Sequence, residues 1–332
     1  APGVLIQPGF PEVLQPAKSG TNVPVSYQPA PDRSLAPVGE TTGRRLALAR
    51  WVTAPGHPLT ARVFVNRIWH HHFGRGIVPT LGNFGHSGSL PSHPDLLDWL
   101  AVDFQQHGWD LKRLHKQIMI STAYRQSYHT DAASQRRALE VDPDNRLLWR
   151  SNLKRLDAEI LRDSILAISG HIDRAVGGSP VMYKTDTSGM SRTDSTRRSL
   201  YLLARRVYPL KFMEIFDAPI IAVHCQQRTM SATVLQSLAQ LNSEFLFEKA
   251  ELMADRVAVA AGKDAAARIR LAFELVFTRE PGESELDQSL LFLEEQTAIH
   301  VAAEIAGDQA ERMALADMCH MMMSTNEFLY AE

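Results

Sequence analysis

The sequence predicts a mainly α-helical fold: a single large helical domain with an extended N-terminal arm and at most a small β-sheet. Apolar residues recur at helical spacing through residues 41–124 and 231–325, and strand signals are few and short. The first 40 residues contain eight prolines, which forbid long helices. We therefore expect a Pro-rich arm over residues 1–40 and a helical domain over residues 41–332.

Composition narrows the class of protein. The chain has 332 residues, of which 45% are hydrophobic and 22% charged, and its formal net charge is −2. This balance argues against nucleic-acid binding, which needs an excess of clustered Lys and Arg. No apolar run approaches the roughly 18–20 residues of a membrane span. The chain does not begin with Met, so we expect a mature or excised fragment.

Cysteine usage limits the expected cofactors. The chain contains Cys225 and Cys319 only, which are either bridged or two buried thiols. No C-x-x-C-H motif occurs, so haem attachment of the c type is not expected in this chain. No cofactor is predicted.

In the first half of the chain, apolar periodicity and end signals predict four helices. The first lies within residues 41–52. The second runs from near Leu59 to Phe73, and Gly74 ends it. A capping-box pattern at Ser92-His93-Pro94-Asp95 starts the third, and Asp110 caps the fourth. The polar segment 128–147 is expected to be loop and turn.

The second half is also predicted to be mostly helical. One helix is expected from about Lys154 to Ser169, followed by a loop over 171–198. The segments 199–204 and 220–223 are the best strand candidates, but both are short and either could be helical. Further helices are expected over residues 231–241, 243–261, 264–277, 283–300 and 308–323.

The stretch around His70-His71-His72 is the first candidate site. Adjacent helical residues point about 100° apart, so the three imidazoles cannot chelate one ion, and no metal site is predicted. Polar residues beside the triplet and in the following Gly-rich loops are instead candidate binding residues: Asn66, Arg67, Asn83 and His93.

The second candidate site is a carboxylate pair on the predicted helix 154–169. Glu159 and Asp163 are four residues apart and share one face, with Arg155 and Arg162 alongside. One interpretation is an exposed ion ladder of Arg155, Glu159 and Arg162. The other is a buried or cleft-lining cluster completed by Arg67, since paired carboxylates with separated pKa values are a common acid–base device. Glu159, Asp163 and Arg67 are thus the candidate catalytic residues, and Arg162 is a further candidate binding residue.

Many ordered blocks resemble one family, the planctomycete-specific C-terminal domain of unknown function (domain of unknown function family 1553, planctomycete-specific domain one). The blocks cover nearly the whole chain; they include Asn66-Arg67-Ile68-Trp69, Phe73-Gly74-Arg75-Gly76, Pro91-Ser92-His93-Pro94, Arg155-Leu156-Asp157-Ala158-Glu159, Arg197-Arg198-Ser199-Leu200-Tyr201, Phe216-Asp217-Ala218-Pro219 and Asn326-Glu327-Phe328-Leu329-Tyr330.

The resemblance implies the C-terminal part of a large exported bacterial protein with a cytochrome-like domain upstream, and therefore an extracytoplasmic location. It implies no catalytic residues. Two functions are expected from different classes. The first is a binding or scaffolding module, with the upstream domains and polysaccharide as partners and a link to polysaccharide or redox processes. The second is a hydrolytic enzyme that uses the Glu159 and Asp163 pair in a polar cleft.

Overall fold

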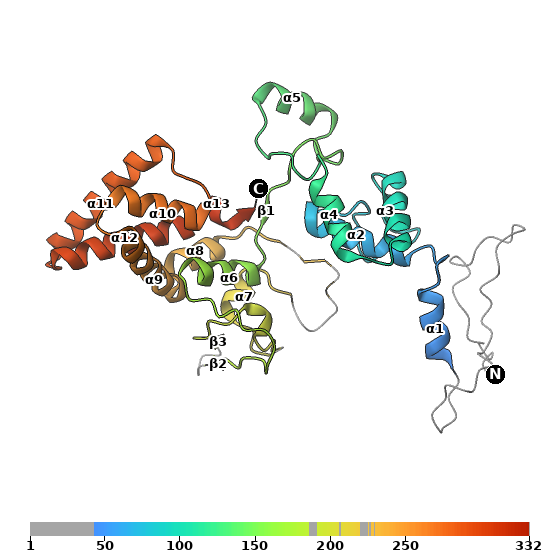
Figure 1. Ribbon diagram of the computed structural model, residues 1–332, viewed down its shortest axis with the longest axis horizontal. Helices are drawn as coiled ribbons and strands as arrows, with labels where there is room; N and C mark the ends of the chain where they lie inside the picture. The colour runs from blue at the N-terminus through green and yellow to red at the C-terminus, as the bar shows by residue number, and fades with distance from the viewer. Residues whose placement is uncertain are drawn as a thin grey trace, which may run out of the picture. The chain divides into compact units, whose positions relative to one another are not determined.

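The computed structural model describes residues 43–185, 191–205, 207–219, 225, 227–228 and 230–331 (Figure 1). The arm predicted for residues 1–40 and the strand predicted for 220–223 lie outside these residues. The described chain is mainly helical, which confirms the predicted fold class. Its strands form two small antiparallel pairs, β1 with β4 and β2 with β3.

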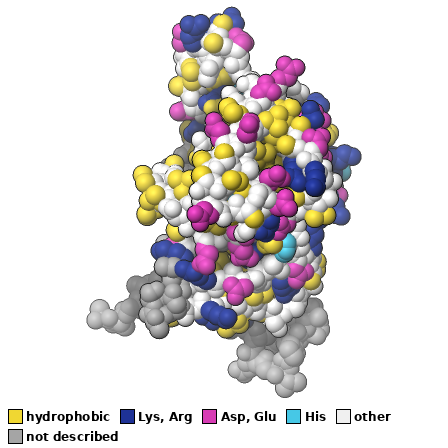
Figure 2. Space-filling view, turned by 90° about the vertical axis from the view of Figure 1, so that its left-hand side faces the viewer, with side chains coloured by type: hydrophobic (Ala, Val, Ile, Leu, Met, Phe, Trp, Pro, Cys, Tyr) yellow, Lys and Arg dark blue, Asp and Glu magenta, His cyan; other side chains and the backbone are white. Residues whose placement is uncertain are grey.

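Residues 1–152 and 153–332 form two compact units, and each has its own hydrophobic core. The single domain expected over 41–332 stays a prediction. Among the described residues, no helix is long and apolar enough to cross a membrane. On the face drawn in Figure 2, acidic and basic side chains are interspersed, in keeping with the small net charge.

The first unit contains five helices in its described part: α1 (Arg44–Val52), α2 (Thr60–Phe73), α3 (Pro94–Gln106), α4 (Leu111–Ile120) and α5 (Ala132–Val141). Its core joins α2, α3 and α4 through side chains that include Val65, Trp69, Leu100 and Phe104. These residues recur at three- and four-residue spacing, so each helix presents one apolar stripe to the others.

Most helix ends in this unit follow the predicted signals. Gly74 adopts φ 75° after α2, a left-handed conformation that glycine adopts at little steric cost. Asp110 caps α4 by accepting a hydrogen bond from the Arg113 amide. The capping box at Ser92 was wrong: His93 is the N-cap, and the Ser92 hydroxyl lies 3.0 Å from its Nδ1.

The loop predicted for 128–147 was also wrong in its middle, where α5 forms. Asp131 caps this helix by accepting from the amides of Ala133 and Ser134. None of the residues of α5 is buried. The segment is polar and offers few apolar residues for a core to bury, so the sequence indicated a loop.

The second unit begins with β1 (Lys154–Arg155), which pairs with β4 (Tyr330–Ala331). The helix predicted from Lys154 therefore starts later, as α6 (Ala158–Ile168). The strand predicted for 199–204 was wrong as well, because Ser199–Tyr201 form a 3-10 helix, η3, and only Leu202 makes a bridge, with Val181. The other short elements are β2 (Lys184–Thr185), β3 (Ser191–Arg192) and α7 (Lys211–Ile215).

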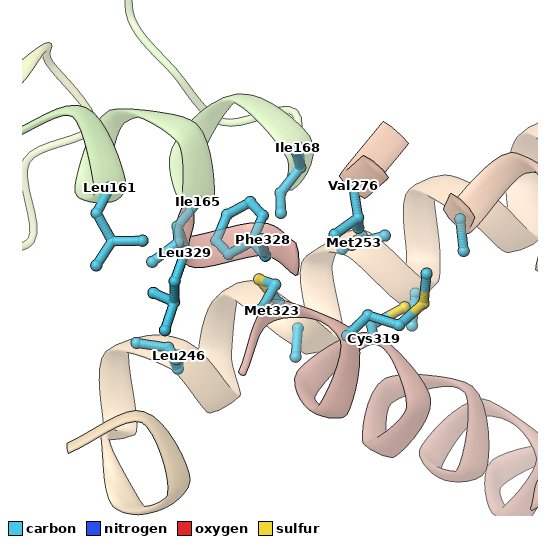
Figure 3. Packing of buried hydrophobic residues seen from close by; sticks show 14 of the residues in the cluster. Leu161, Ile165, Ile168, Leu246, Met253, Val276, Cys319, Met323, Phe328 and Leu329 are labelled. Carbon is cyan, nitrogen blue, oxygen red and sulfur yellow. The ribbon is translucent and has the colours of Figure 1, made fainter. Parts of the chain in front are cut away.

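Helices from the C-terminal half build the larger core: α8 (Val234–Asn242), α9 (Glu244–Ala261), α10 (Ala265–Phe277), α11 (Glu283–Ala302), α12 (Gly307–Met323) and α13 (Asn326–Leu329). Figure 3 shows Leu161 and Ile165 of α6 directed toward Leu246, Met323 and Phe328 of these helices. Burial of its apolar stripe fixes α6 against this core. The polar face of α6, which carries Glu159 and Asp163, is left for other contacts.

Candidate functional site

Glu159, in the first turn of α6, is held by Arg228. The Arg228 Nη1 and Nη2 donate to the two carboxylate oxygens at 2.6 and 3.1 Å, a bidentate arrangement that fixes both groups. Burial raises the pKa of the Glu159 carboxyl, but the hydrogen bonds and charge of Arg228, together with a backbone hydrogen bond, outweigh it, and the pKa lies below its ordinary value. Glu159 is therefore ionised at neutral pH and carries no proton to donate.

Asp163, one turn later, has a different set of partners. Its Oδ1 accepts from the Ser199 backbone amide and from the Ser199 hydroxyl, both at 2.7 Å. Arg162 Nη1 and Arg198 Nε lie 3.8 and 4.0 Å away. The carboxylate thus fixes the start of η3 on α6. The two carboxylates share a helix face but serve separate contacts.

The predicted ladder of Arg155, Glu159 and Arg162 was wrong. Arg155, whose side chain is 5% exposed, donates from Nη2 to Asp217 at 2.8 Å. It also donates to the backbone oxygens of Phe216 and Ser231, both at 3.1 Å. Arg155 therefore ties β1 to the turn after α7 and to the segment before α8.

Asp217 is the centre of this buried network. Its carboxylate also accepts from the Ser231 amide at 2.8 Å and from Gln236 Nε2 at 3.2 Å. Burial raises the pKa of the Asp217 carboxyl, but the hydrogen bonds from Ser231 and Arg155 together lower it by more. The pKa of Asp217 therefore lies below its ordinary value. Sequence reasoning missed Asp217; the only signal was its place in the Phe216-Asp217-Ala218-Pro219 block.

Arg162 is a buried cation, with 2% of its surface exposed. Its Nη1 donates to the Arg197 carbonyl at 3.0 Å and to the Ser199 hydroxyl at 3.2 Å, and its Nη2 donates to the Ser195 carbonyl. Burial lowers the pKa of the guanidinium, opposed by Asp163. The side chain therefore organises the loop before η3 by satisfying its carbonyls.

An open pocket of about 640 Å³ lies beside Arg162, and we call it the α7–α9 pocket. Its wall combines two aromatic rings with hydroxyl, amide and charged groups. The residues that matter below are Arg162, Thr193, Phe212, Asn242, Ser243 and Phe245. Phe212 and Phe245 meet edge to face, with ring centroids 5.5 Å apart, and Arg162 lies 5.9 Å from the centre of the Phe245 ring.

Much of the charge around this pocket is internally paired. Arg192 contacts Glu244 at 2.5 Å, and Lys249 contacts Glu248 at 2.6 Å. The positive and negative charges of each pair cancel, so the pocket wall is polar but has no strong electrostatic field of one sign. Such a surface suits an uncharged polar ligand better than a highly charged one.

The candidate residues of the first unit have local contacts. Asn66 is fully buried, and its amide both donates to and accepts from the Val78 backbone, at 2.9 and 2.8 Å. Asn83 accepts from the Gly85 amide at 3.0 Å and donates to Ser87 at 3.1 Å. These side chains hold the Gly-rich loops in shape.

The remaining first-unit candidates are Arg67, which is exposed on α2, and His93, which is partly buried at the start of α3. His93 borders a recess of only about 20 Å³. Arg67 belongs to the first unit and the carboxylates of α6 to the second. A cluster of Arg67 with Glu159, Arg162 and Asp163 stays a prediction.

No group of three or more His, Cys, Asp or Glu side chains among the described residues is arranged to hold a metal ion. Within the His triplet, His72 Nε2 lies 2.8 Å from His115 Nδ1. The two cysteines, whose pairing the sequence left open, are free: Cys225 is exposed, and Cys319 is buried. Burial raises the pKa of the Cys319 thiol to about 12.

Comparison with known proteins places this architecture in a family. No curated protein and no solved structure matches the chain. The family model PSD1, described as a protein of unknown function (DUF1553), matches residues 44–293. This range spans α1 to most of α11 and includes the α6 network and the α7–α9 pocket. The chain therefore belongs to the DUF1553 family, as its sequence blocks predicted.

Proposed function

We propose that this chain is a non-catalytic binding module and that the α7–α9 pocket binds a saccharide unit of a polysaccharide. The observation that carries the proposal is the pocket wall, where Phe212 and Phe245 adjoin Thr193, Asn242 and Ser243 in a volume of about 640 Å³. Ligand sites typically combine apolar and aromatic surface with a few polar groups that fix orientation.

The chemistry of a sugar ring matches this wall. One face of a pyranose is made of C–H groups, which pack on an aromatic ring, and its edge carries hydroxyls that donate and accept hydrogen bonds. Asn242 offers both a donor and an acceptor, as do the hydroxyls of Thr193 and Ser243. The volume of about 640 Å³ lies within the range of about 300–1,000 Å³ that is typical of ligand pockets.

The contacts of the carboxylates favour binding over hydrolysis. A glycosidase needs one carboxyl that holds a proton and one that is free to act as nucleophile or base. Glu159 is ionised and held by Arg228, and Asp163 accepts two hydrogen bonds from Ser199. Neither carboxylate lines the α7–α9 pocket.

The wider setting is part of the same proposal. The module would belong to an exported multidomain protein, located outside the cytoplasm, in which upstream cytochrome-like domains carry any redox step. In this arrangement the chain would hold polysaccharide near the other domains. Within the first unit, Arg67 and His93 stay binding candidates, whereas Asn66 is buried and holds the Val78 backbone, and Asn83 holds the loop at Gly85.

A binding experiment tests the pocket. Isothermal titration of the full chain with a panel of neutral and acidic oligosaccharides should find at least one ligand, and Phe245→Ala and Asn242→Ala should each weaken it about tenfold or more, equivalent to roughly 1.4 kcal/mol. Asn326→Ala, an exposed asparagine on α13 outside the pocket, is the matched control. No binding across the panel, or equal binding by all variants, would reject the pocket assignment.

The hydrolase alternative rests on the Glu159 and Asp163 pair and is tested with the same panel. Release of reducing ends by the wild-type chain, abolished in Glu159→Gln and Asp163→Asn, would establish it and overturn the binding proposal. We expect the wild-type chain to release no more reducing ends than a variant that carries both Glu159→Gln and Asp163→Asn.

A further inference from the structure

Helix α8 buries polar side chains and exposes aliphatic ones, which is the reverse of a usual amphipathic helix. Its two glutamines are buried, with Gln236 and Gln240 each 6% exposed. Its aliphatic side chains point outward instead: Val234 is 75% exposed, Leu235 67%, Leu238 47% and Leu241 55%. A surface helix normally buries its apolar stripe and exposes its polar face.

The inward glutamines explain how this orientation is held. Gln236 Nε2 donates to the Ile215 carbonyl at 3.0 Å and to Asp217 at 3.2 Å, so it is part of the Arg155 network. The backbone carbonyl of Gln240 accepts from His320 Nε2 at 2.8 Å, whereas the Gln240 side-chain Nε2 is buried with no hydrogen bond among the described residues, so Gln236 is the glutamine whose side chain holds the helix. Rotating α8 to bury its leucines would break these contacts and leave Asp217 with fewer partners.

The exposed side chains form one continuous stripe. Val234, Leu238 and Leu241 are spaced four and three residues apart, and Leu235 lies beside them, so all four share one side of the helix. We call these four residues the α8 face. Contiguous apolar surface of this kind marks interaction sites more often than single exposed leucines do.

The charge pattern indicates what covers the α8 face. No charged residue occurs from Ser231 to Ser243, although 22% of the chain is charged. A surface without charge offers no salt-bridge partner to a charged protein. It can approach its own copy without like-charge repulsion, as a two-fold symmetric contact requires.

We propose that the α8 face is the interface between two copies of this chain, packed helix against helix about a two-fold axis. The stripe is self-complementary in chemistry, since each copy presents the same four aliphatic side chains. The exposed and uncharged Ala232, Thr233, Ser237 and Asn242 form its rim.

The area of the face sets the strength of the contact. The four aliphatic side chains, which are between 47% and 75% exposed, and their uncharged rim would make a small interface. Interfaces of less than about 1,200 Å² in total are typical of weak, transient contacts. The dimer should therefore be weak and dependent on concentration, rather than obligate.

Sedimentation velocity of the full chain between about 1 and 300 μM tests the inference, because dissociation constants in this range correspond to weak association. We expect the wild type to shift from monomer toward dimer with rising concentration. The double variant Val234→Glu with Leu235→Glu should remain monomeric throughout. Acidic residues are favourable in the first turn of a helix, so these substitutions should leave the fold intact. Val259→Glu, at a valine 87% exposed on α9, is the matched control and should dimerise like the wild type.

Three outcomes would overturn the inference: a monomeric wild type at the highest concentration, a dimer that persists in the double variant, or a large fall in the melting temperature of that variant. The last result would mean that the α8 face packs inside its own chain. A covalent check uses Leu238→Cys, at the centre of the stripe, in a Cys225→Ser background, where mild oxidation should link two copies through residue 238. Cross-linking that is equally efficient with Val259→Cys in the same background would also count against a specific contact.

Discussion

At the scale of single residues, the polar face of α6 is defined by which partner each carboxylate finds. Spacing along the sequence placed Glu159 and Asp163 on one side of a helix, but it could not show that Arg228 reaches one and Ser199 the other. These partners lie 69 and 36 residues away along the chain. Long-range pairing of this kind decides whether a carboxylate is an acid, a base or a structural anchor.

The Glu159 and Arg228 pair supports a residue-scale prediction about pKa. Replacing Arg228 by Ala should raise the pKa of the Glu159 carboxyl, because burial is then opposed only by a backbone hydrogen bond. NMR titration of the carboxyl carbon measures this change. Lys211→Ala, which removes an exposed partner of Glu214, is the control and should leave the Glu159 titration in place.

The same substitution should change stability in a pH-dependent way. Because the folded-state pKa of Glu159 is lowered, the pair stabilises the protein above the unfolded-state value of 4.5, and this contribution is lost as the pH falls. Arg228→Ala should cost roughly 1 kcal/mol at pH 7, since both side chains remain about one-third exposed. Urea denaturation at pH 7 and pH 3 measures the difference, and an equal cost at both values would contradict the assignment.

At the scale of elements, close approach of the backbone explains the Gly-rich turn after α2. A Cβ on Gly76 would lie 2.6 Å from the Val78 carbonyl oxygen and 2.8 Å from Asn66 Nδ2. The Asn66 amide already holds both hydrogen-bonding groups of Val78. The turn therefore needs glycine for space, and the motif that resembled a binding loop has a packing role.

We predict that Gly76→Ala lowers the free energy of unfolding by about 1–3 kcal/mol, because backbone must shift to admit the methyl group. Gly307→Ala is the matched control: no atom lies within 4 Å of its added Cβ, and it begins α12. That change should be neutral or stabilising by up to about 1 kcal/mol. Chemical denaturation of both variants compares them, and equal effects would show that the Asn66 contact does not restrict the turn.

At the scale of the whole molecule, two hydrophobic cores share no residue. Val65, Trp69 and Phe104 belong to the first, and Met253, Met318 and Phe328 belong to the second. Because hydrophobic stabilisation comes from contacts within each core, local opening of one unit need not open the other.

Met253→Ala tests this separation. Met253 is fully buried, so its truncation should destabilise the second core by about 2–5 kcal/mol. Hydrogen exchange followed by mass spectrometry should then show faster exchange in α9 and α12 and unchanged protection in α2 and α3. Val259→Ala, on the same helix but 87% exposed, should leave all four helices protected. Equal loss of protection in both units after Met253→Ala would show that they unfold together.

The helical class and the positions of the long helices follow from local signals in the sequence, namely apolar periodicity, caps and glycine stops, whereas the family follows from the ordered sequence blocks. Asp110 caps the start of α4 with its carboxylate, and Gly74 ends α2 in the left-handed conformation that glycine readily adopts. Short or fully exposed elements escaped this reasoning: α5 has no buried residue, and β1 exists only because residues 330–331 return beside it.

The outward orientation of α8 and the partners of Arg155, Glu159 and Asp163 could be established from the folded chain alone. In each case the deciding contact comes from residues distant in the sequence, such as Asp217 or Arg228. Periodicity shows which residues share a face of a helix, but what that face meets depends on how distant segments pack. The candidate site is therefore defined by contacts between residues that are distant in the sequence.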